Sequence, residues 1–274
     1  MTVTLYAWAT PAFVNESPFD HTWVTTYDNR QNAYENVGAV AAAGEKYWFC
    51  WGDFHVRGGV PDNPTGALGS QAADVAIASC LVQANADSRD SPPAQGTIFV
   101  YGVDGVCHQL ANQVLYSTGG PEQTPLTVKK ARGYFASTFI YHTYGLQRAA
   151  WSNKIATCAP SLAASALGGV EMKTPDLADD FEAHAREVLG ADETELLNKL
   201  LTLKSEVQNF AARAIPGFAP PDAATLNARN QHLIDQAAIL LGPEKFKKVF
   251  GFEAGQKVNL VDPAIAEKSM KREQ

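Results

Sequence analysis

The architecture of this chain is set by one stretch, Gly105-Val106-Cys107-His108-Gln109-Leu110-Ala111-Asn112-Gln113-Val114-Leu115. Asp104-Gly105 supplies a turn after the apolar run 97–101, which is typical of a buried strand. Four aliphatic residues then recur at helical spacing and predict an amphipathic helix over 107–118: Leu110, Ala111, Val114 and Leu115. The sequence therefore places a thiol at the first turn of a helix, directly behind a strand.

A thiol in that position has the surroundings of a nucleophile. The first-turn N–H groups and the positive end of the helix dipole favour a negative charge there. With a nearby imidazolium they can lower a cysteine pKa from about 8.5 to between roughly 3.5 and 7.5. The competing interpretation is an inert core residue, since Cys107 also lies on the apolar stripe of its helix and unpaired cysteines are often buried. The local pattern leaves both interpretations open.

Composition narrows the class of protein. The chain has 274 residues and a formal net charge of -7, which argues against nucleic acid as a partner. Its N-terminal sequence resembles no signal peptide and no apolar run is long enough for a membrane span, so we expect a cytoplasmic protein, with non-classical export as the alternative. The cysteines are widely spaced and predict free thiols: Cys50, Cys80, Cys107 and Cys158.

The pattern along the chain predicts an α+β fold in two parts. A domain over 1–170 is expected to hold strands at about 2–8, 21–27, 46–55, 97–101 and 132–144, and helices at about 70–86, 107–118 and 146–158. A helical accessory region over 176–274 follows, with helices at about 175–190, 192–214, 222–241 and 243–250. It carries no convergent set of titratable residues, so we expect it to add stability, bind a protein partner or form an oligomer.

Two histidines are candidates for the base that would serve Cys107. His21 opens a run of strand formers early in the chain, and His142 ends a similar run after the cysteine. A base needs only to reach the thiol within about 2.6 to 3.2 Å and to be oriented by a third polar group. Chain order alone does not choose between them.

Three short motifs between about 20 and 120 resemble a known family. They are His21-Thr22-Trp23-Val24, the aromatic run Tyr47-Trp48-Phe49-Cys50-Trp51-Gly52-Asp53-Phe54-His55, and the helix that opens with Cys107. Together they resemble the circularly permuted papain-like fold of NlpC-type cysteine peptidases and amidases and of lecithin retinol acyltransferase-like proteins. The resemblance implies an antiparallel sheet packed on a nucleophile helix, with the histidine strand ahead of the cysteine in the chain.

The resemblance also implies roles for individual residues. Cys107 matches the nucleophile and His21 the general base. The third polar residue is expected on the next strand, where alternation places Asp53 and His55 on one face with Trp51; we slightly prefer His55. The backbone N–H groups of Cys107 and His108 at the helix start would form the oxyanion hole.

Two functions follow as hypotheses. The first is a cysteine hydrolase or acyl transferase that cleaves an amide, isopeptide or related acyl bond in a peptide or amide substrate through an acyl-enzyme. The second is a non-catalytic binding module or effector that keeps a papain-like cleft. No ligand-like spacing or phosphate-binding fingerprint occurs, so we expect neither a metal nor a cofactor.

Overall fold

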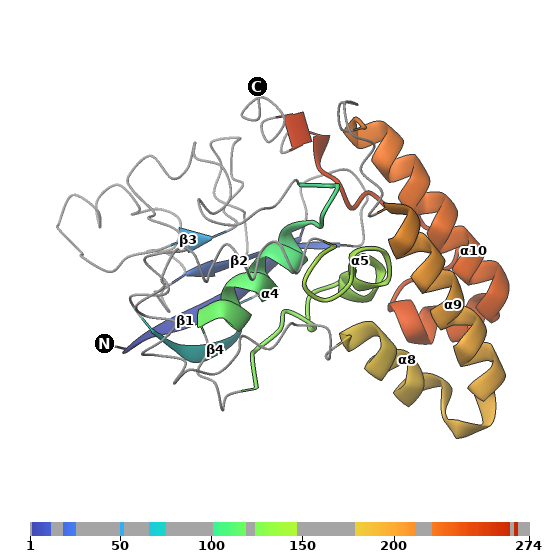
Figure 1. Ribbon diagram of the computed structural model, residues 1–274, viewed down its shortest axis with the longest axis horizontal. Coiled ribbons are helices and arrows are strands. Elements are labelled where there is room, and N and C mark those ends of the chain that lie inside the picture. Colours follow the sequence, from blue (N-terminus) through green and yellow to red (C-terminus); the bar gives the residue numbers. More distant parts are fainter. Residues whose placement is uncertain are drawn as a thin grey trace.

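The structure, a computed structural model, describes residues 2–11, 19–25, 50–51, 66–74, 101–118, 124–146, 179–211, 221–263 and 266–267. These residues form a small antiparallel sheet and a set of helices, as the α+β prediction requires. Figure 1 shows the sheet and helix α4 on one side of the molecule, the C-terminal helices on the other and α5 between them.

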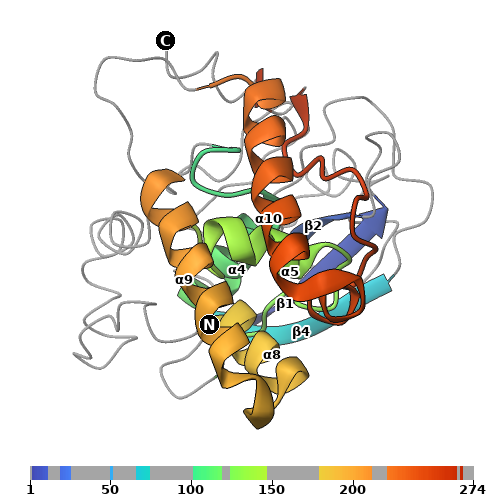
Figure 2. The ribbon, with the colours of Figure 1, turned by 90° about the vertical axis from the view of Figure 1, so that its right-hand side faces the viewer.

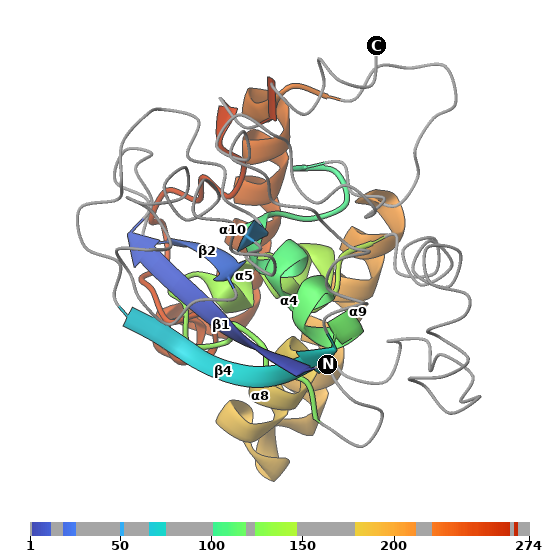
Figure 3. The same cartoon turned by 90° about the vertical axis from the view of Figure 1, so that its left-hand side faces the viewer.

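The sheet has the strand order β3-β2-β1-β4 and every pairing is antiparallel. Its strands are β1 (Thr2–Pro11), β2 (Asp20–Thr25), β3 (Cys50–Trp51) and β4 (Gly66–Asp74). The register pairs Ala7 with Val24, and both side chains enter the hydrophobic core together with Leu5. Figure 3 views the molecule from the side on which this sheet lies.

Helix α4 (Cys107–Thr118) begins and ends at the predicted residues and packs against β2. The backbone N–H of Val106 donates to Oε1 of Gln109 at 3.0 Å, and the N–H of Leu110 donates to the carbonyl oxygen of Val106. This is the return half of a capping box, with Val106 at the N-cap and Cys107 at the first helical position. The helix start is therefore fixed by local chemistry.

The remaining helices cover the far side of α5 (Tyr134–Tyr141), as Figure 2 shows. They are α8 (Asp180–Leu189), the short 3-10 turn η2 (Ala191–Glu193), α9 (Thr194–Ala211) and α10 (Ala223–Phe250). Gly242 interrupts α10 with a φ of 72° just before Pro243, which confirms the predicted break between the last two helices. None of the helices in these described ranges combines the length and hydropathy that a bilayer crossing requires.

An aromatic cluster holds these helices together. Phe250 of α10 packs against Phe139 of α5 and Phe181 of α8 with ring centroids 5.5 Å apart in each pair, and stacks on Phe246 at 4.6 Å. The same hydrophobic core continues to Leu5 in β1, so the C-terminal helices and the sheet share one apolar interior. The predicted boundary near 170–176 lies outside the described residues.

Two predicted elements are wrong where the structure describes them. The run 132–144 forms helix α5 instead of a strand, and nearly all of its residues are buried, so no polar face distinguished the two. Residues 70–74 belong to strand β4 instead of a helix; Gln71 is buried while Ser70 and Ala72 are exposed, which is strand alternation. The predicted helix 146–158 lies, apart from Leu146, outside the described residues.

Candidate functional site

Cys107 is the first residue of α4 and lies beside β2. The backbone N–H groups of Cys107 and His108, and the backbone and hydroxyl of Thr22, lie close enough to its sulfur to lower the thiol pKa. Cys107 retains 7% of its surface exposed, whereas residues 108–111 retain at most 1%. The sequence prediction of a thiol at a helix start is thus confirmed, and the residue is buried.

Burial nevertheless dominates the electrostatics of Cys107. Removal from water raises the pKa of the thiol to about 11, although Thr22 and the first-turn N–H groups act in the opposite direction. At neutral pH the resting side chain is therefore a neutral thiol and not the thiolate that the sequence suggested. The helix N-terminus favours the anion, but less than desolvation disfavours it.

His21 lies on the opposite face of β2 from Cys107. Alternation along β2 puts His21 and Trp23 on one face, and Thr22, which approaches the thiol, on the other. The ring of His21 stacks on that of Trp23 with centroids 5.7 Å apart and an interplanar angle of 16°. The structure therefore does not bring together the predicted nucleophile and the predicted base.

The imidazole of His108 is buried in the core and hydrogen-bonded through both ring nitrogens. Its Nε2 lies 2.9 Å from the carbonyl oxygen of Asp20 and its Nδ1 lies 2.8 Å from the hydroxyl of Ser137. Since a carbonyl only accepts, Nε2 is the donor and Nδ1 accepts from Ser137. Burial lowers the pKa of His108 to about 4, so the ring is neutral at pH 7. His108 ties α4 to β2 and α5, and only its backbone N–H approaches the sulfur.

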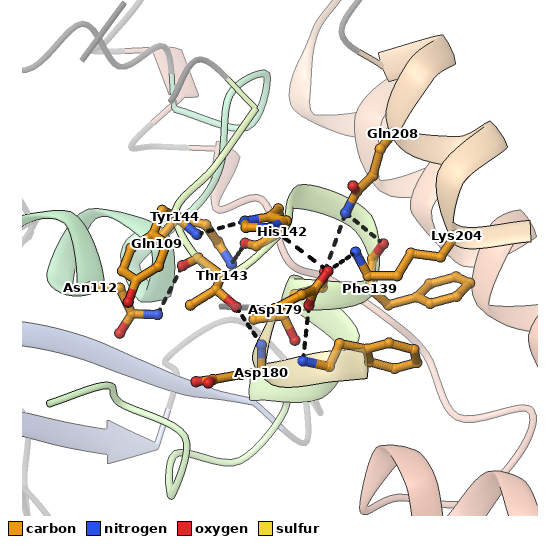
Figure 4. Close-up of polar contacts among 12 residues, drawn as sticks. Gln109, Asn112, Phe139, His142, Thr143, Tyr144, Asp179, Asp180, Lys204 and Gln208 are labelled. Atoms are coloured by element: carbon orange, nitrogen blue, oxygen red, sulfur yellow. Dashed lines mark hydrogen bonds and ion pairs between the residues drawn. The ribbon is translucent and has the colours of Figure 1, made fainter. Parts of the chain in front are cut away.

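Sequence analysis missed a row of buried amides on α4. The side chains of Gln109, Asn112 and Gln113 donate to three consecutive carbonyl oxygens, those of residues 142, 143 and 144, at 3.2, 2.9 and 2.7 Å. Their i, i+3, i+4 spacing places them on one helix face, and Figure 4 shows Gln109 and Asn112 beside this segment. The available signal was three amides inside a helix whose other residues are mostly apolar.

The second histidine candidate, His142, belongs to a junction with the C-terminal helices (Figure 4). It follows α5 with a φ of 66°, which is rare for a residue with a side chain. Its Nε2 lies 3.8 Å from a carboxylate oxygen of Asp179, and its Nδ1 accepts from the N–H of Tyr144. The same carboxylate pairs with the buried ammonium of Lys204 at 2.5 Å and caps α8. The imidazole of His142 is thus directed to Asp179.

The loop that leads into Cys107 is held by the C-terminal part of the chain. The hydroxyl of Tyr101 lies 3.5 Å from the carbonyl oxygen of Leu260 and accepts from the N–H of Asp262 at 3.3 Å. Burial, and secondly the charge of an ionised Cys107, raise the pKa of Tyr101, and both residues belong to the same buried cluster. The hydroxyl of Tyr141 donates to the carbonyl oxygen of Gly102 at 2.7 Å.

The remaining predicted site residues, Asp53 and His55, lie outside the described residues. Across the ranges that the structure does describe, no three His, Cys, Asp or Glu side chains are grouped as a metal site would need. No family model, curated protein or solved structure matches the chain.

Proposed function

We propose that the chain is a cysteine-dependent hydrolase or acyl transferase that acts on an amide, isopeptide or related acyl bond, with Cys107 as its nucleophile. One observation carries the proposal. Cys107 occupies the first position of α4, with the N–H groups of Cys107 and His108 near its sulfur. A cysteine helix against an antiparallel sheet is the arrangement that the resemblance to permuted papain-like proteins implies.

The neutral resting thiol determines the kind of catalysis. Because the pKa of Cys107 is about 11, only a small fraction of the side chain is ionised at pH 7. A base therefore has to remove the proton while the sulfur attacks. His21 lies on the other face of β2, and the rings of His108 and His142 are bound elsewhere. A different imidazole is therefore needed.

We assign this role to His55 on the basis of the sequence pattern. Alternation predicts that His55 shares a strand face with Trp51. Trp51 is paired with Val24, whose side chain lies in the core with Leu110 of α4. Residues paired across antiparallel strands share a face. The proposal therefore assigns the base to His55, which the sequence pattern predicts on the same strand face as Trp51, with Asp53 as an orienting residue.

The reaction then follows in balanced steps. The base takes the Sγ proton of Cys107 as the sulfur–carbon bond forms, and the first-turn N–H groups of Cys107 and His108 stabilise the oxyanion. When the tetrahedral intermediate collapses, the carbon–nitrogen bond breaks and the imidazolium gives its proton to the departing amine. Water or a second nucleophile attacks the thioester and releases the acyl group with the Cys107 thiol restored.

The second candidate function is a non-catalytic binding module. It is favoured by the burial that raises the pKa of Cys107 to about 11, because such a thiol is inert unless a base reaches it. Under this alternative the thiol packs the start of α4 and forms no acyl-enzyme.

Acyl transfer from p-nitrophenyl acetate separates the two functions. Native protein is incubated with the ester at about pH 7, and acetylation of each cysteine is followed by peptide mass spectrometry, with Cys107→Ala as control. We expect acetyl-Cys107 to form and decay while nitrophenolate release continues, and the control to lose that release. Folded protein in which Cys107 stays unmodified would overturn the enzymatic proposal and leave the binding module.

A further inference from the structure

Two amide side chains of α10 form hydrogen bonds with the backbone of segment 256–262 near the C-terminus. Asn227 donates to the carbonyl oxygen of Val261 at 2.8 Å and accepts from the N–H of the same residue at 2.9 Å. One turn further along the helix, Gln231 accepts from the N–H of Val258 at 2.7 Å and donates to the carbonyl oxygen of Gln256 at 3.2 Å. We call segment 256–262 the strap.

The strap packs against the loop that presents Cys107. Gly102 has a φ of 84°, and a Cβ at this position would lie 2.8 Å from a methyl group of Val261. The strap therefore approaches the loop so closely that a glycine is required there. Beside it, the hydroxyl of Tyr101 contacts Leu260 and Asp262. Two residues after Gly102, the carbonyl oxygen of Asp104 accepts from the N–H of Leu146 at 2.8 Å.

Tyr101 links this packing to the thiol. Its hydroxyl is bound by the strap, its backbone pairs with that of Gly105, and the N–H of Gly102 donates to the carbonyl oxygen of Gly105 at 2.7 Å, two residues before Cys107. A strap that moved away would release the hydroxyl of Tyr101 and loosen the loop 101–106 that leads into Cys107. Water reaching the sulfur removes the desolvation that suppresses its ionisation.

We propose that the strap, anchored by Asn227 and Gln231, is a positioning and gating element that sets the reactivity of Cys107 through Tyr101. The inference deepens the proposed function, since it takes Cys107 as the reactive residue. Its test measures the thiol alone and requires no acyl transfer. Residues more than 150 positions apart in the chain would thus act on one another through a single ring and two amides.

The test is the alkylation rate of each cysteine by iodoacetamide in the native protein. The variant Asn227→Ala/Gln231→Ala removes both anchors, and Gln236→Ala is the matched control, because this exposed amide of the same helix contacts only the neighbouring His232 turn. We expect alkylation of Cys107 to rise at least tenfold in the double variant and to stay unchanged in the control. Tyr101→Phe, which keeps the ring and removes only the hydroxyl, is expected to give a smaller rise.

Two results would overturn the inference. One is an unchanged Cys107 rate in a double variant that circular dichroism shows to be folded; if that variant does not fold, an unchanged rate in Tyr101→Phe decides in the same way. The other is an equal rise at Cys50, Cys80 and Cys158, which would mean general loosening. A rise confined to Cys107 in a protein that transfers no acetyl group would refute the proposed function and leave the strap inference intact.

Discussion

The core around α4 and the core around α5, α8 and α10 differ in the side chains that fill them. Around α4, buried polar side chains accompany the apolar ones: His108, Gln109, Asn112 and Gln113 are at most 1% exposed, and each binds a group outside the helix. Between α5, α8 and α10 the largest buried contacts are those of a cluster of phenylalanine rings. Around α4, hydrogen bonds fix the position of each polar side chain. Around α5, α8 and α10, the aromatic rings contribute mainly hydrophobic burial.

The two kinds of packing differ in how precisely the atoms must be placed. A buried amide is stable only when its partners lie in hydrogen-bonding geometry, so the amide row of α4 fixes its register against residues 142–144. Aromatic rings tolerate small shifts because dispersion and hydrophobic burial have little directionality. The helix that carries Cys107 is therefore closely constrained in its position.

The largest effect is expected from truncating the aromatic core around α5, α8 and α10. Phe250→Ala removes a ring that is 1% exposed and packed on four other phenylalanines, so it should lower the free energy of unfolding by about 3–5 kcal/mol. Urea denaturation measures the change. The control is Ile239→Ala on the same helix, where the side chain is 84% exposed and a change within about 0.5 kcal/mol is expected. Equal losses in the two variants would contradict the assigned core.

The core around α4 should show its largest effect on acidification. His108 has a pKa of about 4 when folded and 6.5 as a free side chain, so its contribution is present above pH 6.5 and is lost as pH falls toward 4. The shift corresponds to about 3 kcal/mol of unfolding free energy. His108→Gln should remove this part of the pH dependence, measured as urea unfolding between pH 7 and pH 4.5. The same slope in both proteins would show that the ring is not the buried neutral group.

A smaller loss is expected from one member of the amide row. Asn112→Leu keeps the branched shape of the side chain but replaces its amide by methyl groups, which leaves the N–H of Val128 and the carbonyl oxygen of Thr143 without this partner. We expect a loss of about 2 kcal/mol in unfolding free energy, because each buried group keeps its desolvation penalty. Asn198→Leu on the exposed face of α9 is the control and should change stability by less than about 0.5 kcal/mol. A loss no larger than that of the control would mean that the row does not determine packing.

Local signals in the sequence were sufficient for some elements. Helix α4 was predicted at its observed bounds because the turn at Asp104-Gly105 and an aliphatic stripe agree over 104–118. The break at Gly242-Pro243 was predicted because proline and glycine act locally. Helix α5 was mistaken for a strand, since a segment buried on all sides carries neither periodicity.

The candidate site depended on information that a single strand does not contain. Thr22 and Trp23 are both buried, so burial does not reveal which face of β2 meets α4. If the alternation of side chains along β2 is assigned one residue out of step, His21 is placed on the wrong face of the sheet. The strap and the amide row join residues about 30 to 160 positions apart, and their pairing depends on tertiary packing.

Under the proposed function, Cys107 is made nucleophilic by His55 and not by His21. The most direct measurement is the rate of acetyl-Cys107 formation from p-nitrophenyl acetate in His55→Ala and His21→Ala, each shown to be folded. The account predicts at least a hundredfold slower acetylation in His55→Ala, in line with the usual contribution of a general base, and little change in His21→Ala. Loss of acetylation in His21→Ala with an unchanged rate in His55→Ala would contradict it.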